Sequence, residues 1–378
     1  MTMFNKKSQQ QIGDVQNGTV NQAGGNINIQ NGLSYNEVKD LCETTVRAEV
    51  TRLTGEAKMA MMQLLADFQE RFYARLSELE NKQNLEKLNR PSVQLCVYKT
   101  ILETSKVEND ELTKDELLEI LIDRLNADER ATEKVVIEDA IDRAAKVSRP
   151  LKALMVALQL RNIIIPGPFG VDDILTQYGD LFKDLSCLNR LDIAYGRQMQ
   201  CIFPMTGLHS GDAYEDVLLH NYDLLFRHCG TLGQFKTLAE QYPQLHYDIR
   251  IGNIDNMKIV SIDGRNGRDV TDESRIFFVT TSSEFLKEQL RQQGHDDMIP
   301  ALDALLQTMP PFTHEEMRQY LHSLSEGWDY VFEVFQRREV IPLLLSPVGN
   351  YLAMAYTRRL GHQPEHFLQE IYNHEMGW

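Results

Sequence analysis

From Ser34 onward, apolar residues recur at intervals of three and four, and this spacing limits the fold more than any other feature. It places apolar side chains along one face of a helix. Ser34, with Glu37 three residues later, matches a capping box and predicts where that helix begins. Unbroken to about residue 88, the helix would be about 80 Å long at a rise of 1.5 Å per residue. That length predicts a stalk or a helix packed against copies of itself, and the alternative is two helices broken near Thr54–Gly55.

Helical spacing continues through residues 89–165 and returns in the C-terminal part, with one long pattern over residues 313–337. Thr113, which has an acid three residues later, is a second predicted N-cap. A third helix is predicted to start at Pro347, because proline is favoured at the first helical position. Helices therefore account for most of the expected structure.

Outside the N-terminus, β-leaning composition is confined to residues 247–281, which contain Asp–Gly and Asn–Gly turn pairs. The predicted fold is mainly α: a multi-helix protein with a short N-terminal oligomerising β element, a long helix and a small β-leaning insertion. The predicted segments are a Gly/Asn/Gln-rich β oligomerisation segment (1–32), a long amphipathic helix (33–88), a helical domain (89–245) and a C-terminal α domain that contains the insertion (246–378).

The segment before the first helix is poor in apolar side chains. From Gln9 to Gly32, 16 of 24 residues are Asn, Gln or Gly. One copy alone buries too little to offset a backbone ordering cost of about 1–2 kcal/mol per residue. A disordered polar tail is one interpretation; we favour a β-structure shared by several chains, with β-branched side chains stacked inward. The predicted oligomer contacts are Ile12, Val15, Val20, Ile27, Ile29, Val38 and Leu41.

Charge and composition narrow the class of protein. A formal net charge of −16 argues against nonspecific binding of nucleic acid or of an anionic membrane. Residues 108–142 hold 13 acids against 4 bases, which is typical of a solvated helix face; a docking surface for a basic partner is the alternative. Five scattered cysteines without CxxC spacing predict reduced, buried thiols and a cytoplasmic protein. No stretch approaches the roughly 18–20 apolar residues of a membrane span, so we expect no membrane partner.

The sequence lacks the motifs of nucleotide-binding loops, zinc proteases and serine hydrolases. His314 and His322 lie two helical turns apart, whereas His362 and His366 flank a proline, so we interpret all four as surface or structural histidines. We predict no cofactor, no metal and no catalytic role. The rival class is an assembly-regulated hydrolase or nuclease, in which two or more of these side chains would converge: His209, Asp212, Glu215, His220 and His228.

Two stretches, "GGNINIQNGLSYNEVKDLC" at residues 24–42 and "LSPVGNYLAMAYTRRLG" at residues 345–361, resemble an uncharacterised bacterial protein family. Its members share a short Gly/Asn β-run, a long following helix and a terminal helix of this type. The resemblance covers both ends of the chain well. In the middle of the chain it rests only on the helical spacing of apolar residues. It implies no established activity and no catalytic residues, and it implies a link to phage defence or stress responses.

We therefore predict a self-assembling bacterial scaffold or sensor, in which multivalent display raises avidity. Its expected partners are copies of itself and an unknown protein or phage-derived partner, recognised by the helical and C-terminal regions. A third class is a nucleic-acid sensor that uses Arg337, Arg338, Arg358 and Arg359. The acidic composition favours packing helices with exposed arginines instead, so we do not expect nucleic acid as a partner.

Overall fold

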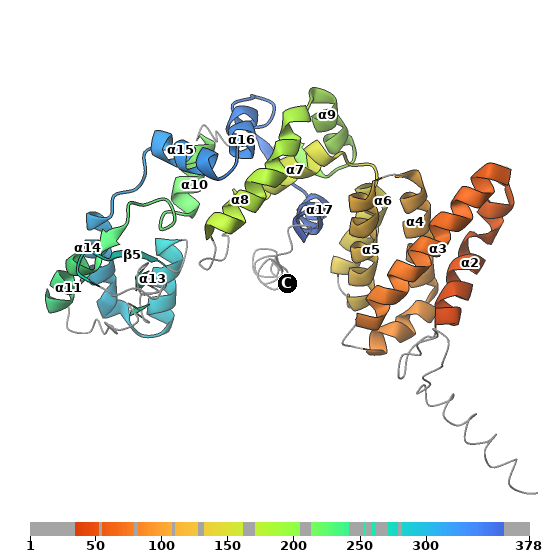
Figure 1. Cartoon of the computed structure of the whole chain (residues 1–378), viewed down its shortest axis with the longest axis horizontal. Helices are drawn as coiled ribbons and strands as arrows, with labels where there is room; N and C mark the ends of the chain where they lie inside the picture. The colour runs from red at the N-terminus through yellow and green to blue at the C-terminus, as the bar shows by residue number, and fades with distance from the viewer. Residues whose placement is uncertain are drawn as a thin grey trace, which may run out of the picture. The chain divides into compact units, whose positions relative to one another are not determined.

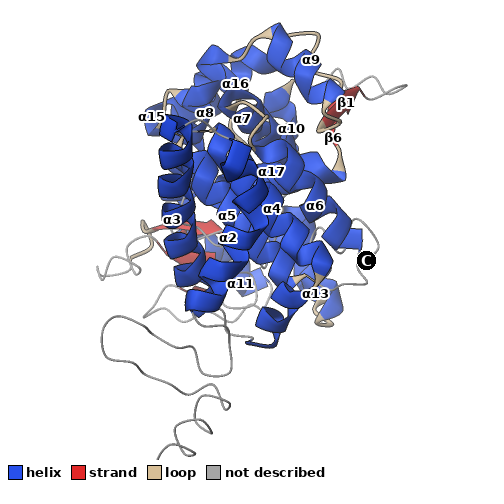
Figure 2. Cartoon of the chain, turned by 90° about the vertical axis from the view of Figure 1, so that its right-hand side faces the viewer, coloured by secondary structure: helices blue, strands red, loops and turns tan. Residues whose placement is uncertain are grey.

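Helices make up most of the described chain in the computed structural model, and the predicted mainly α fold is confirmed (Figure 2). Contacts divide the chain into two compact units. The first comprises Met1–Ser148 and Pro347–Arg359, and the second Arg149–Ser346 and Leu360–Trp378. The structure describes residues 35–52, 55–78, 82–107, 110–127, 132–161, 171–204, 213–241, 253–254, 259–261, 271–278 and 282–358.

This division differs from the predicted boundaries after residues 88 and 245, and the predicted boundary after residue 32 lies outside the described residues. The helices on either side of residue 88 pack together in the first unit, and the second unit runs through residue 245 without a division. The physical reason is that helical periodicity identifies which face of a helix is buried but not which helix buries it.

The first unit is a helical bundle in which consecutive helices pack on one another. Its innermost side chains are fully buried and include Val38, Phe72, Leu117, Leu121 and Ile141. Its elements are α2 (Tyr35–Arg52), α3 (Gly55–Glu78), the 3₁₀ helix η1 (Lys82–Asn89), α4 (Pro91–Lys106), α5 (Glu111–Asn126), α6 (Thr132–Ala144) and α17 (Pro347–Thr357).

The single long helix predicted to residue 88 is wrong. The chain forms two helices, α2 and α3, that lie side by side as an antiparallel pair (Figure 1). Gln69 Nε2 donates to the Lys39 carbonyl oxygen at 3.3 Å, and the rings of Tyr35 and Tyr73 meet edge to face at 5.2 Å. These contacts require the chain to reverse, so the alternative with a break near Thr54–Gly55 is confirmed. The apolar stripe that suggested a stalk instead buries itself within the bundle.

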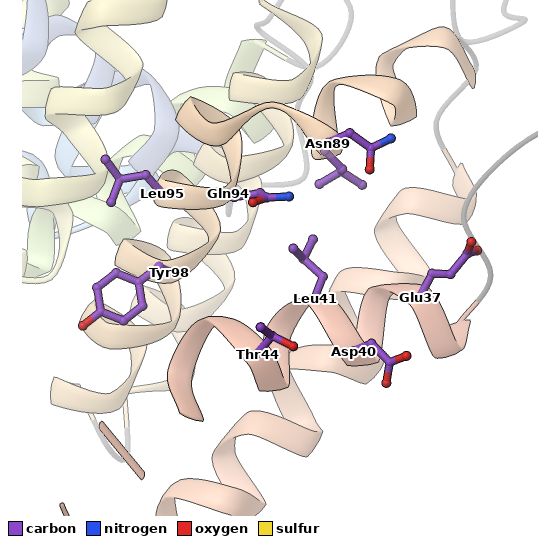
Figure 3. Close-up of a pocket in the computed structure, with 9 residues that line it drawn as sticks. Glu37, Asp40, Leu41, Thr44, Asn89, Gln94, Leu95 and Tyr98 are labelled. Carbon is purple, nitrogen blue, oxygen red and sulfur yellow. The ribbon is translucent and has the colours of Figure 1, made fainter. Parts of the chain in front are cut away.

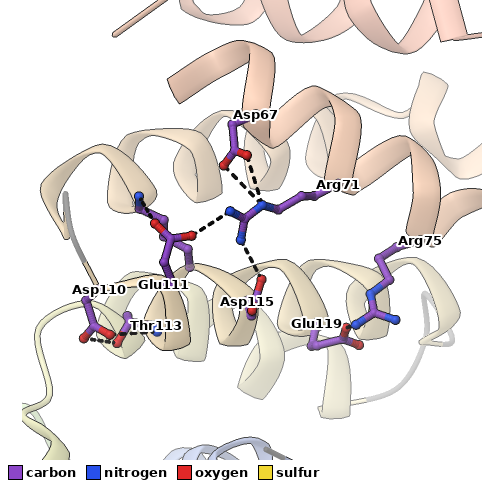
Figure 4. Close-up of polar contacts among 9 residues, drawn as sticks. Asp67, Arg71, Arg75, Asp110, Glu111, Thr113, Asp115 and Glu119 are labelled. Carbon is purple, nitrogen blue, oxygen red and sulfur yellow. Dashed lines mark hydrogen bonds and ion pairs between the residues drawn. The ribbon is translucent and has the colours of Figure 1, made fainter. Parts of the chain in front are cut away.

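The predicted acidic face is exposed, and α3 supplies cations that pair with it (Figure 4). Arg71 binds Glu111 at 2.6 Å and Asp115 at 2.9 Å, and Arg75 binds Glu119 at 2.8 Å. Helix α5 begins before the predicted N-cap at Thr113, because the side chain of Asp110 caps it instead, accepting from the Thr113 backbone N–H at 3.3 Å. These acidic side chains of α5 therefore form ion pairs with α3 inside the first unit.

Helix α17 begins at Pro347 as predicted, and it packs on α5 and α6 although it comes from the far end of the chain. The Tyr351 hydroxyl donates to Asp123, and Arg358 Nη1 lies 2.7 Å from Asp123 Oδ2. Burial, reinforced by the Asp123 carboxylate, raises the pKa of Tyr351 well above its ordinary value. The charged end of α17 is thus part of the interior packing of the first unit.

The second unit combines short helices with two small sheets. One core cluster, which includes Phe235, Ile276, Leu302 and Leu305, lies among its sheet and helices. Its helices are α7 (Arg149–Gln159), α8 (Val171–Phe182), η2 (Lys183–Cys187), α9 (Arg190–Gln198), α10 (Tyr214–Asn221), α11 (Leu232–Gln241), α13 (Ser283–Gln292), η4 (Asp296–Met298), α14 (Ile299–Thr308), α15 (His314–Leu324) and α16 (Gly327–Phe335).

The β-leaning insertion at residues 247–281 does contain strands, but it is not the whole of the β-structure. Strands β3 (Asn253–Ile254), β4 (Ile259–Ser261) and β5 (Arg275–Phe278) fall inside it, and β2 (Gly230–Thr231) joins them in the order β2-β5-β4-β3, antiparallel throughout. A separate antiparallel pair is formed by β1 (Ile202–Pro204) and β6 (Leu343–Leu345). These additional strands are two or three residues long, too short to show a period of two.

The continuous helix predicted over residues 313–337 is also wrong, because the chain breaks at Ser325 into α15 and α16. The Ser325 hydroxyl donates to Asp180 Oδ1 at 3.0 Å. Trp328 is buried one turn later, and its indole N–H donates to the Leu175 carbonyl oxygen on α8 at 2.9 Å. The break therefore turns α16 onto α8.

Candidate functional site

The first unit contains a groove between α2 and α4, lined in part by the end of η1, with a volume of about 680 Å³. Volumes of about 300–1,000 Å³ are typical of ligand-binding pockets. Figure 3 shows Leu41 directed from α2 toward Asn89 and Gln94, with Glu37 and Asp40 on the α2 side. The lining residues are Glu37, Asp40, Leu41, Thr44, Leu88, Asn89, Gln94, Leu95 and Tyr98.

The helical spacing of α2 accounts for its two surfaces. Val38 and Cys42, four residues apart, are fully buried in the bundle. Leu41 and Thr44 are displaced around the helix from that face, and they border the groove. The orientation of α2 is fixed on its other side by α3, through the bond from Gln69 to the Lys39 carbonyl.

The groove is acidic and partly apolar. Two carboxylates, Glu37 and Asp40, stand at its α2 edge, and none of the described residues that line it is a Lys, Arg, His or Cys. Leu95 is 53% exposed there, which is a large solvent contact for a leucine. The polar side chains of the described lining are the two carboxylates, the hydroxyls of Thr44 and Tyr98 and the carboxamides of Asn89 and Gln94. Its chemistry suits recognition of a cationic, apolar segment.

The predicted oligomer contacts fall into three groups. Val38 is 0% exposed, so its proposed role is corrected: it packs within its own chain and has no surface to offer another copy. Leu41 borders the groove, where it remains partly exposed. Ile12, Val15, Val20, Ile27 and Ile29 lie outside the described residues.

The side chains proposed for the rival enzyme do not form one cluster in the described part of the chain. His209 and Asp212 lie outside it. Glu215 is buried and bound by Arg318, whose Nε donates to Glu215 Oε1 at 2.6 Å. His228 Nε2 lies 3.4 Å from Glu316 Oε1, so its contact is with a carboxylate outside the proposed set.

The other histidine candidates are similarly dispersed. His314 Nε2 lies 2.8 Å from Asp216 and His322 Nδ1 lies 2.7 Å from Asp329, so each histidine contacts a different carboxylate. His362 and His366 lie outside the described residues. No group of three or more His, Cys, Asp or Glu side chains in the described ranges is arranged to hold a metal ion.

The arginines proposed for nucleic-acid binding are partly committed to the protein. Arg358 pairs with Asp123, and Arg337 donates to the Leu188 carbonyl oxygen at 3.1 Å and to Glu333 at 3.2 Å. Arg338 is exposed, and Arg359 lies outside the described residues. Arg358 and Arg337 therefore have structural contacts that a nucleic acid would have to replace.

The cysteines differ from the predicted set of buried thiols. Cys42, Cys96 and Cys201 are buried, whereas Cys187 and Cys229 are exposed; all are free. Burial raises the pKa of Cys42 to about 12 and that of Cys96 to about 11.

We expect Cys187 and Cys229 to be the thiols that a thiol reagent modifies in the native protein near neutral pH, because their side chains are exposed whereas the other three are buried. Cys229 should react more slowly than Cys187, because desolvation raises the pKa of its thiol. All five thiols should react after unfolding in urea. The measurement is the number of modified cysteines per chain, by mass spectrometry over time. Rapid native modification of Cys42 or Cys96 would contradict the packing of α2 and α4.

Sequence reasoning identified Leu41 but missed the groove. Its α4 side comes from residues about fifty positions later in the chain. The available signal was Leu95, an apolar residue on the exposed face of α4, and periodicity alone does not distinguish such a residue from ordinary surface variation.

Every helix in the described ranges falls short of the length and hydropathy that crossing a bilayer requires. A family model matches residues 32–365, which is well over half of the chain and includes the groove and α17. No curated protein and no solved structure matches the chain.

Proposed function

The chain belongs to an uncharacterised protein family, whose model spans residues 32–365, and we propose that it is a self-assembling, non-catalytic scaffold or sensor. Residues 9–32 of several chains associate, and the two helical units are presented in multiple copies. A cytoplasmic, bacterial setting and a role in phage defence belong to this proposal.

One observation carries the proposal, the composition of residues 9–32. Among its 24 residues, 16 are Asn, Gln or Gly, and the aliphatic side chains are isolated from one another. The ordering cost of about 1–2 kcal/mol per residue exceeds what so few apolar groups return in one chain. Several chains share the same cost per residue, but they add side-chain stacking and amide ladders that a single chain lacks.

The helical units suit display. The first unit has buried residues from α2 through α6, and the second has its own cluster around Phe235 and Ile276. Their described surfaces offer the groove as a recognition feature on each copy. Linking several weak sites raises overall avidity without any stronger individual contact, provided that the geometry permits simultaneous binding.

We expect the full-length chain to have the mass of a multimer in solution and a chain that begins at Ser34 to have the mass of a monomer. The measurement is light scattering coupled to size-exclusion chromatography, over a range of concentrations. Equal masses for the two chains would end the proposal.

Two full-length variants separate side-chain chemistry from mere length. Replacing Ile12, Val15, Val20, Ile27 and Ile29 together by asparagine removes the aliphatic groups, and we expect a monomer. The matched control replaces five glutamines of the same segment by asparagine and should remain a multimer. A multimer in both variants would contradict the stacking of these aliphatic side chains.

A further inference from the structure

The groove between α2 and α4 has a chemistry that one segment of the chain itself complements. We propose that residues 4–7, Phe-Asn-Lys-Lys, bind in the groove of their own chain. Phe4 contacts the apolar surface of Leu41 and Leu95, and the two lysines lie against Glu37 and Asp40. This inference does not rest on the proposed function, because it concerns a contact within one chain.

Charge complementarity selects this segment over the rest of the leader. Lys6 and Lys7 are the only Lys or Arg residues before Lys39 in the sequence. The run from residue 8 to residue 38, which includes the strand-like NINIQ, therefore has no cationic side chain to place beside the two carboxylates. Lys39 itself forms an ion pair with Glu43, one turn further along α2, with 3.7 Å between Lys39 Nζ and Glu43 Oε1.

Apolar complementarity supports the same choice. Phe4 stands two residues before Lys6, so an aromatic ring and a cation lie close together in the sequence. The groove repeats this arrangement with opposite charge: Leu41 is flanked on α2 by Asp40, and Leu95 and Tyr98 contribute apolar surface to the lining from α4. A segment that is only cationic or only apolar would use half of this surface.

The connection between the two parts favours the same chain over a second copy. Residues 8–34 join Lys7 to the start of α2, and Glu37 lies within the first turn of that helix. At about 3.3–3.6 Å per residue, such a connection has ample length to return to its own origin. Tethering gives the segment an effective concentration on the order of millimolar at the groove of its own chain.

The test places a photo-crosslinker in the full-length chain by the substitution Phe4→p-benzoylphenylalanine, followed by irradiation and mass-spectrometric mapping. We expect crosslinks to peptides that contain Leu41 or residues 94–98, in a product that has the mass of one chain under denaturing conditions. Crosslinks confined to other surfaces would overturn the proposal. A product with the mass of two chains would overturn the choice of the same chain.

Charge exchange provides the matched control. Lys6→Glu with Lys7→Glu, in the crosslinker chain, should lower the yield of the groove crosslink roughly 2- to 30-fold, because two exposed ion pairs contribute that much. Adding Glu37→Lys and Asp40→Lys to the same chain should restore it. A yield unaffected by the first exchange, or one not rescued by the second, would contradict recognition by these charges. The solution mass of each variant, measured separately, reports on assembly.

Discussion

Replacing Gly327 by alanine is expected to destabilise the second unit by about 3 kcal/mol or more, at the upper end of overpacking effects. Helices α8 and α16 approach so closely at this point that a Cβ on Gly327 would overlap the Gly179 carbonyl oxygen and lie 2.8 Å from its carbonyl carbon. Both atoms belong to the backbone, so relief requires one helix to move. That movement would disturb the hydrogen bond from Trp328 to Leu175, since Trp328 follows Gly327 directly.

Urea denaturation followed by tryptophan fluorescence measures this effect, because buried Trp328 reports on the crossing. The matched control is Gly55→Ala at the start of α3, where a Cβ would meet nothing within 4 Å. There we expect no loss, and a gain of up to about 1 kcal/mol because alanine orders at lower entropic cost. Equal midpoints for Gly327→Ala and the unchanged chain would show that α8 and α16 are further apart than described.

Gly327 also illustrates what a sequence leaves open. Within residues 313–337, apolar positions follow helical spacing across the glycine, so the pattern predicts one helix. The need for glycine comes from Gly179, about 150 positions earlier, and no local feature reveals that approach. Similarly, the stripe along α2 and α3 has the same spacing in a stalk and in a hairpin, because both bury one face. Only Gly55 marked the reversal.

Other features could be predicted because their causes are local. The start of α17 follows from Pro347, whose fixed φ suits the first helical position. The packing of α17 on α5 and α6 could not be predicted from the sequence. It depends on contacts of Asp123 with Tyr351 and Arg358, which lie more than 200 positions later in the chain. The groove has the same origin: Leu41 is apolar on an expected helix face, but its facing residues come from η1 and α4. Local rules therefore identified single residues of the site, and tertiary packing assembled them.

We expect Glu138→Ala to destabilise the first unit by about 3–5 kcal/mol, the usual cost of removing one partner from a buried ion pair. Arg124 on α5 is 0% exposed, and its Nε donates to Glu138 Oε1 on α6 at 2.8 Å. The substitution leaves a guanidinium in the interior without that carboxylate. Ser92 Oγ on α4, 3.5 Å from Arg124 Nη2, is neutral and cannot replace the lost charge.

The two partners are unequal, which gives the prediction a specific order. The Glu138 side chain is 31% exposed, so Arg124→Met leaves a carboxylate that can still be hydrated. Arg124→Met should therefore lower the free energy of unfolding by less, about 1.5–3 kcal/mol, which corresponds to a hydrogen bond between charged groups. The double variant Arg124→Met with Glu138→Ala should cost less than the sum of the two single changes, because it leaves neither charge of the pair without its partner.

A second ion pair in the same unit provides the control, since Lys99 and Asp142 join α4 to α6 at 2.7 Å. Their side chains are 34% and 41% exposed, so Asp142→Ala should cost no more than about 1 kcal/mol. Urea denaturation followed by circular dichroism compares all four variants. Equal losses for Glu138→Ala and Asp142→Ala would mean that Arg124 is hydrated in solution, and an additive double variant would mean that the two side chains do not interact. The expected order instead follows from burial: removing a carboxylate costs more when its cationic partner is buried, as Arg124 is, than when that partner is partly hydrated, as Lys99 is.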